Sequence, residues 1–214
     1  MGIKFLGINL DENLSWKQHI DIISTKISKA IHVINRVKHI LPMNALKTLY
    51  YSLVQSHLNY GLLIWGNSFS INKLVKLQKR ALRVIYNKPF RSHTDSLFKD
   101  GNILKVNDMY RFQCLLFIFD FKHNLLPKSF VNFYPDRPSD RLTRQLQDIY
   151  TPQARTTFST RSMFHNAPKI WNISSNNIKS SPTRRMLKLN FFNQTLNTYA
   201  TTRCNNPMCS ECNN

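Results

Sequence analysis

The chain has 214 residues, of which 42% are hydrophobic, and it carries a formal net charge of +19. This length suffices for one large or two small domains, and the apolar content excludes a chain that is disordered throughout. A protein this basic usually meets a polyanion such as DNA, RNA or an acidic membrane surface; the alternative is a basic protein without such a partner. No apolar run approaches the roughly 20 residues of a membrane-spanning helix, and no signal peptide is visible.

The N-terminal segment begins with the apolar run "IKFLGINL". This run predicts a short strand, and the polar residues "DEN" after it predict a turn. Ser15 and Gln18 have the spacing of a capping box, which would start a helix there. A strand needs a neighbouring strand for its backbone hydrogen bonds, and the sequence offers no clear second one. We therefore expect a strand or hairpin remnant whose sheet lies outside this chain.

Three helical patterns follow, each with apolar residues at intervals of three and four. The first has the stripe Ile20, Ile23, Ile27, Ile31 and Ile34. The second, after Pro42 and before Gly61, has Leu46, Leu49, Leu53 and His57 on one side. The third, capped by Ser70, has Leu74, Leu77, Ala81 and Ile85. The sequence therefore predicts a mainly α-helical bundle.

The first and third helices carry basic residues away from their apolar stripes. They are Lys26, Lys29 and Arg36 on the first helix, and Lys73, Lys76, Lys79, Arg80 and Arg83 on the third. Such a row repels itself unless an anion lies opposite; the alternative is a solvated face. We expect these eight residues to bind nucleic acid through its phosphates, with salt-dependent affinity for any sequence. Tyr60, Trp65 and Tyr86 could stack on bases, although a core or loop-anchoring role is simpler for each.

The second half begins with a strongly aromatic segment, "MYRFQCLLFIFDFKHNLL", which predicts a largely buried helix. Residues 135–160 are polar and contain three prolines, which predicts a linker or long loop. After them come "TRSMFHNAPKIWNIS", with Trp171 as an apolar anchor, and a final helix, "TRRMLKLNFFNQTLNTYA".

The cysteines gather in the tail "CNNPMCSEC". Cys204, Cys209 and Cys212 are candidate zinc ligands, with His165, a water or a residue of a longer chain as the fourth; the alternative is a tail of free thiols. Cys114 is most simply a small core residue. A secreted disulfide framework would spread more cysteines along the chain, so we expect a reducing compartment, the nucleus or the cytoplasm.

No motif for stand-alone catalysis is visible. The sequence has no phosphate-binding or dinucleotide glycine motif. Its acidic residues are scattered, whereas two-metal nucleotidyl transfer needs clustered carboxylates. His57 faces an apolar stripe, which favours a core role over a catalytic one. We therefore predict no catalytic residues in this chain.

Three segments in this order resemble one protein family. "FLGINLDENLSWKQHI", "LKTLYYSLVQSHLNYGLLIWGNS" and "INKLVKLQKRALRVIYNK" are similar to the region after the catalytic palm in jockey-like reverse transcriptases of non-LTR retrotransposons. The later "RSMFHNAPKIWNIS" and the final helix resemble the C-terminal part of those RNA-directed DNA polymerases. The resemblance covers most of the chain and is weakest across residues 135–155.

This resemblance implies a division of the chain. It implies a palm-end remnant at 1–14, a thumb-like helical domain at 15–134, a linker at 135–160, a C-terminal helical region at 161–200 and a Cys-containing tail at 201–214. The Asp-Asp polymerase motif of the family, with its Mg²⁺, would lie before residue 1. The implied partners are template–primer RNA and DNA and the missing palm and fingers, with no membrane partner.

Three interpretations are compatible with these patterns. The first is a C-terminal reverse-transcriptase fragment that binds template–primer or element RNA and does not polymerise alone. The second is an independent basic helical module that binds nucleic acid. The third is a decayed transposon copy without selected activity.

Overall fold

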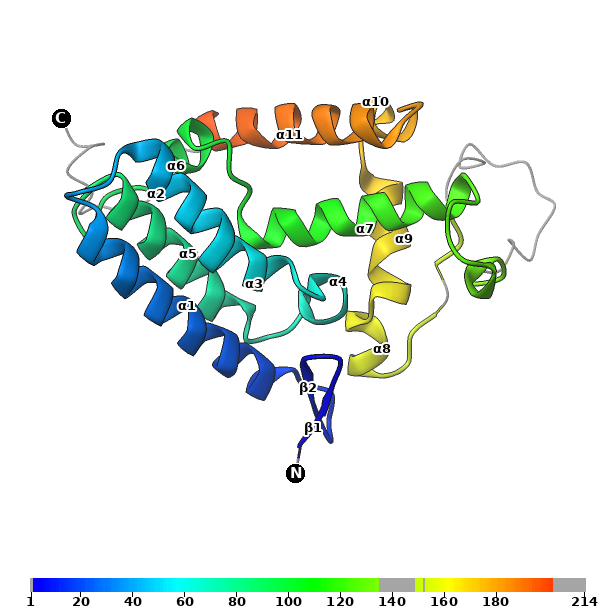
Figure 1. Ribbon diagram of the computed structural model, residues 1–214. Coiled ribbons are helices and arrows are strands. Elements are labelled where there is room, and N and C mark those ends of the chain that lie inside the picture. The colour runs from blue at the N-terminus through cyan, green and yellow to red at the C-terminus, as the bar shows by residue number, and fades with distance from the viewer. Residues whose placement is uncertain (1, 135–148, 152, 202–214) are drawn as a thin grey trace. The chain divides into compact units, whose positions relative to one another are not determined.

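The computed structural model describes residues 2–134, 149–151 and 153–201, with side chains up to residue 199. The fold is mainly helical with a short N-terminal β-hairpin, which confirms the predicted fold class (Figure 1). The chain divides into two compact units. The described residues of unit 1 are 2–109 and 193–201, and those of unit 2 are 110–134, 149–151 and 153–192. The five-part division implied by the resemblance stays a prediction.

The N-terminal hairpin of unit 1 consists of β1 (Gly2–Phe5) and β2 (Ile8–Asp11), paired antiparallel with Phe5 opposite Ile8. Its two loop residues, Leu6 and Gly7, have positive φ angles of 44° and 80°. Positive φ at both positions matches the twist of a tight two-residue hairpin turn. The expectation of a strand without a local partner is therefore wrong, because the segment folds back and pairs with itself.

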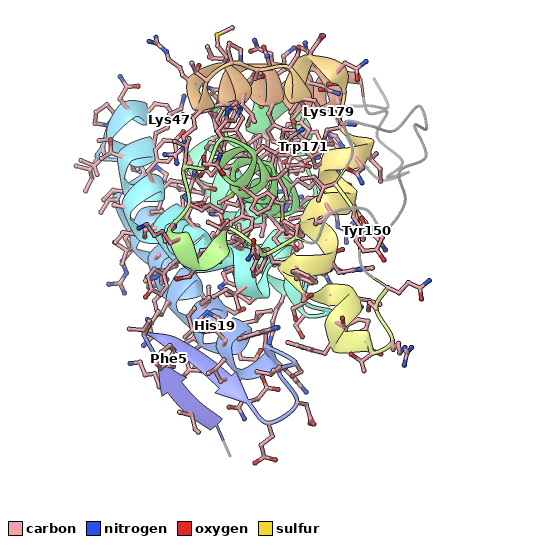
Figure 2. The ribbon with its side chains drawn as sticks, turned by 90° about the vertical axis from the view of Figure 1, so that its right-hand side faces the viewer. Phe5, His19, Lys47, Tyr150, Trp171 and Lys179 are labelled. Carbon is pink, nitrogen blue, oxygen red and sulfur yellow. The ribbon has the colours of Figure 1, made fainter. Side chains whose placement is uncertain are left out.

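The hairpin packs on the helices of unit 1 through β2. Ile8 is buried against Gly61, whose φ of 63° and closeness to Ile8 both favour glycine: a Cβ there would lie 2.7 Å from Ile8 Cδ1. The amide of Asn9 donates to Nδ1 of His19 at 3.3 Å. β1 lies outside this contact, because Ile3 and Phe5 on the same hairpin face are 74% and 62% exposed. In Figure 2, Phe5 lies on the hairpin and His19 on the adjoining helix.

Helix α1 (Lys17–Val37) buries the predicted isoleucine stripe. Its start differs from the prediction, because Ser15 and Gln18 form no capping box. The carboxylate of Asp11 instead accepts hydrogen bonds from the amides of Ser15 and Trp16, each at 2.9 Å, and from the Ser15 hydroxyl at 2.6 Å. Burial acts to raise the pKa of Asp11, but these hydrogen bonds outweigh it and hold the pKa below its usual value.

The second predicted helix is continuous but contains a wide turn. It comprises α2 (Met43–Tyr50), a π-helical turn (Tyr51–Gln55) and α3 (Ser56–Asn59). Its buried residues are Leu46, Tyr50, Val54 and Leu58. The predicted stripe is therefore wrong after Leu46, and Leu49, Leu53 and His57 are only half-buried. A π turn holds more residues than an α turn. Residues that follow one another at intervals of four therefore stay on the same, buried face of this helix.

After the short helix α4 (Leu62–Trp65), helix α5 (Ile71–Ile85) packs along α1. Lys73 near its start pairs with Asp21 of α1, and Asn87 just after its end accepts from Lys38 at 3.1 Å. The two helices therefore run side by side in the same direction (Figure 1). The predicted Ser70 cap does not form; the hydroxyl oxygen of Ser68 accepts from the Ser70 amide at 3.3 Å.

A buried glutamine ties α5 to the following segments. Gln78 is fully buried, although leucine at position 77 was expected on the buried face. Its Nε2 donates to the Tyr50 hydroxyl and to the Leu104 carbonyl, each at 2.9 Å, and its Oε1 accepts from the Val106 amide at 3.0 Å. Gln78 thereby fixes α2 and the segment between α6 (Asp95–Asp100) and α7 (Val106–Lys122).

Unit 2 contains most of α7, α8 (Thr157–Arg161), α9 (Met163–Ile173), α10 (Asn176–Lys179) and the first part of α11 (Arg184–Thr201). Its core is aromatic: Phe133 contacts Phe117 and Phe164 edge-on, and Phe164 stacks on Tyr134. Trp171 is 1% exposed, in agreement with its predicted anchoring role. Cys114 is fully buried, as expected of a core residue, and burial raises its pKa to about 12.

Candidate functional site

The basic residues predicted on α1 all reach solvent. Lys26, Lys29 and Arg36 are exposed, and none of them forms an ion pair with a residue that the structure describes. The only carboxylate on α1 is Asp21. In an α-helix, Lys26 lies about 140° around the axis from Asp21, so the two residues occupy opposite flanks. Because Asp21 contacts α5, Lys26 lies on the flank away from α5.

Helix α5 turns five basic side chains away from the core. Lys73, Lys76 and Arg80 are exposed, and Lys79 and Arg83 are half-buried. The helix has no acidic residue of its own, and its buried residues lie on the opposite side: Leu74, Gln78, Ala81, Leu82 and Ile85. Together with Lys29 and Arg36 of α1, the five basic residues of α5 make up what we call the basic surface.

Two members of the basic surface have structural partners. Lys73 forms its ion pair with Asp21 across the α1–α5 contact, so one carboxylate does lie opposite the lysine row. Nε of Arg83 donates to the Ser92 carbonyl at 2.9 Å. Burial lowers the pKa of Arg83 from its usual value, although an arginine stays charged at neutral pH. Both residues therefore help to hold the fold, whatever else they bind.

The remaining members are available to an external anion. Lys29, Arg36, Lys76, Lys79 and Arg80 form no ion pair with a described residue. Like charges three and four residues apart on a helix repel each other, and that repulsion is relieved when an anion binds. Such side chains can hold phosphate oxygens. The structure therefore keeps five of the eight predicted residues free for this chemistry, and sets Lys26 apart on another flank.

Lys26 acts instead on two histidines. Burial lowers the pKa of both His19 and His57, and the positive charge of Lys26 lowers each pKa further. His57 is half-buried on α3, and His19 is buried at the base of the hairpin. At neutral pH both imidazoles are therefore expected to be uncharged.

The aromatic candidates are used mainly by the fold. Trp65 is fully buried, and its indole nitrogen donates to the Tyr60 carbonyl at 3.0 Å. Tyr86 is half-buried. Tyr60 is 56% exposed, yet its hydroxyl donates to the Leu6 carbonyl and anchors the hairpin turn. None of the three is therefore an open stacking platform.

The predicted zinc ligands Cys204, Cys209 and Cys212 lie outside the described residues. Within the described ranges, no group of three His, Cys, Asp or Glu side chains is close enough to hold a metal ion. Among the same residues, no helix combines the length and apolarity that crossing a membrane would require.

Similar proteins were found among curated sequences. Over 111 residues, which are 49% of the chain, the sequence is 28% identical to the probable RNA-directed DNA polymerase from transposon BS and 30% identical to the RNA-directed DNA polymerase from mobile element jockey, both of Drosophila melanogaster. The resemblance to jockey-like reverse transcriptases is confirmed. The chain corresponds to a small segment of these polymerases, because the match covers 12% of each relative. No family model and no solved structure matches the chain.

Proposed function

We propose that this chain is the thumb-like part, with the region downstream of it, of a jockey-like reverse transcriptase, and that it binds template–primer or element RNA. The observation that carries the proposal is the basic surface of α1 and α5, in which five cationic side chains lack an anionic partner among the described residues. The similarity to two transposon polymerases supports it independently. A helical segment of such an enzyme that contacts nucleic acid needs cations at the spacing of backbone phosphates.

The hairpin is the proposed contact with the rest of the polymerase. Ile3, Phe5 and Leu6 expose 74%, 62% and 74% of their surface. Within the described part of the chain, β1 pairs only with β2, so its outer edge is open to a further strand. An apolar strand with an open edge is an attachment site for another sheet. Following the resemblance, we assign the covering sheet to the palm.

The chain itself is proposed to bind without polymerising. Of the eight basic residues predicted to bind nucleic acid, Lys26 lies on another flank of α1, and seven side chains carry the proposed contact: Lys29, Arg36, Lys73, Lys76, Lys79, Arg80 and Arg83. None of these is a carboxylate that could hold a catalytic metal ion. Nucleic-acid binding and nucleotide incorporation are therefore separate properties, and each has its own test.

Fluorescence anisotropy with a labelled RNA–DNA template–primer tests the binding. The affinity should fall by roughly tenfold or more between about 50 and about 200 mM salt, because several phosphate contacts release counterions. An absence of binding at low salt would refute the proposal. Primer extension with the same duplex tests the second part; robust nucleotide incorporation by the purified chain would contradict it.

A second candidate function is an independent nucleic-acid-binding module. The buried core of unit 1 favours it, because Leu46, Tyr50, Leu74 and Leu82 are all at most 3% exposed without any contribution from another chain. Sedimentation and thermal unfolding separate the candidates. A folded monomer with a cooperative transition supports the module, whereas aggregation through the exposed hairpin supports the polymerase segment.

A further inference from the structure

Asp21 is an isolated carboxylate in a basic stretch of unit 1. Residues 13–94 contain 13 lysines and arginines but a single acidic residue, which is Asp21. Its partner is Lys73 of the basic surface, with which it forms an ion pair across the contact between α1 and α5. Both side chains reach solvent, since that of Asp21 is 45% exposed and that of Lys73 is 58% exposed. The one carboxylate of this stretch therefore lies against a proposed phosphate-binding lysine.

This ion pair lies at the hairpin end of the two helices. Asp21 is within the first two turns of α1, and Lys73 is in the first turn of α5. The Ser68 hydroxyl, just before α5, donates to the Ser15 carbonyl, just before α1, at 3.0 Å. Strand β2 of the hairpin packs on the same end of α1 (Figure 1). The cations of the basic surface that form no ion pair with a described residue all follow later in α1 or α5: Lys29, Arg36, Lys76, Lys79 and Arg80.

We propose that Asp21 competes with the nucleic-acid backbone for Lys73, so that a phosphate binds at the hairpin end of the basic surface only by displacing this carboxylate. The inference rests on the proposed function and identifies the residue that limits the basic surface at one end. A carboxylate and a phosphate both offer anionic oxygens to an ammonium group. Asp21 thereby weakens nucleic-acid binding where the basic surface approaches the hairpin, the segment proposed to contact the palm.

The physical alternative is an ion pair that only ties α1 to α5. Exposed ion pairs contribute little to stability, because water already solvates both charges, and the two helices also pack through their buried faces. The larger effect of Asp21 is on a ligand. Because Asp21 already neutralises Lys73, a phosphate that replaces it releases no counterion from this lysine. Competition therefore changes the salt dependence of binding, whereas a tether changes only the stability of the fold.

Fluorescence anisotropy with the labelled RNA–DNA template–primer tests the competition in the whole chain. D21N should bind roughly fivefold more tightly at about 100 mM salt, and its log–log salt slope should steepen by about 0.9, the value of one further phosphate contact on a duplex. D21N/K73Q should return to the wild-type slope, because no lysine is then released. D120N is the matched control: it also removes one negative charge and one ion pair, that of Asp120 with Arg184 in unit 2, and should leave the slope unchanged.

The outcomes separate this inference from the proposed function. Wild-type affinity and slope in D21N overturn the competition while leaving the basic surface intact. A gain that persists in full in D21N/K73Q, or that D120N shares, also overturns it, because the gain would then come from net charge alone. K73Q gives an independent measurement: it should keep the wild-type slope, and a slope shallower by about 0.9 would show that Lys73 binds phosphate unopposed. A chain that binds no template–primer overturns both proposals.

Discussion

The hydroxyl of Tyr60, just beyond α3, donates a hydrogen bond to the main-chain carbonyl of Leu6 in the turn of the hairpin. The same Tyr60 accepts from the indole of the buried Trp65 through its own carbonyl, at 3.0 Å. One residue thus links the hairpin turn to the helical core. This link explains how a two-stranded hairpin, which is marginally stable alone, keeps a fixed position in unit 1.

The first prediction removes this link. Y60F should lower the free energy of unfolding by about 1 kcal/mol, the usual value of one hydrogen bond, and should speed amide exchange at Asn9 in β2. Urea unfolding and hydrogen exchange measure the two effects. Y51F is the matched control, because Tyr51 is exposed and its hydroxyl forms no hydrogen bond with a described residue. Equal behaviour of the two variants would show that the hairpin is held by apolar contacts alone.

The second prediction concerns the Gln78 network. Q78L should cost about 3 kcal/mol in the free energy of unfolding, because it leaves the Leu104 carbonyl and the Val106 amide buried without partners. Thermal or urea unfolding is the measurement. The control is Q55L: Oε1 of Gln55 is buried and has no hydrogen-bond partner in the structure, so replacing it should be nearly neutral. A Q78L variant as stable as Q55L would mean that the network does not secure unit 1.

The third prediction is a pH dependence at the start of α1. The pKa of Asp11 is lower in the folded chain than in the unfolded one, so its stabilising contribution is present above about pH 4 and disappears as pH falls through the folded pKa. D11N should therefore cost about 1 kcal/mol at pH 7, comparable to the loss of a helix cap. Relative to wild type, this cost should shrink as the pH falls below about 4 and through the folded pKa.

Urea unfolding of both proteins at pH 7 and pH 3 measures the difference. D100N provides the control, since Asp100 is exposed and its carboxylate accepts no hydrogen bond from a described residue. A cost of D11N that stays constant between the two pH values would contradict the assignment of Asp11 as the group that orders this turn.

Regular patterns made much of unit 1 predictable. The isoleucine stripe of α1 and the basic row of α5 follow from a period of 3.6 residues, and both are found in the structure. The buried face of α2 and α3 could not be derived in this way. The π turn at 51–55 changes the number of residues per turn, so Tyr50, Val54 and Leu58 replace the expected leucines and histidine.

Other features depended on tertiary contacts or on unusual turn chemistry. The hairpin turn uses Leu6 at a positive φ, where asparagine or glycine would have signalled a turn. Asp11 was expected only to belong to a polar turn, yet it orders the entry to α1 from a distance that local cap patterns do not cover.

The most direct test of the central claim is the salt dependence of binding for two variants of equal net charge. K76Q/K79Q/R80Q removes three cations from the basic surface and leaves Lys73 and Arg83, which have structural partners, in place. K4Q/K99Q/K169Q removes three exposed cations from elsewhere. Anisotropy with labelled oligouridylate across salt concentrations should give a log–log slope about 2 units shallower for the first variant, from three lost phosphate contacts at about 0.7 each, and a nearly unchanged slope for the second. Equal slopes for the two variants would contradict the claim that α5 holds the nucleic acid.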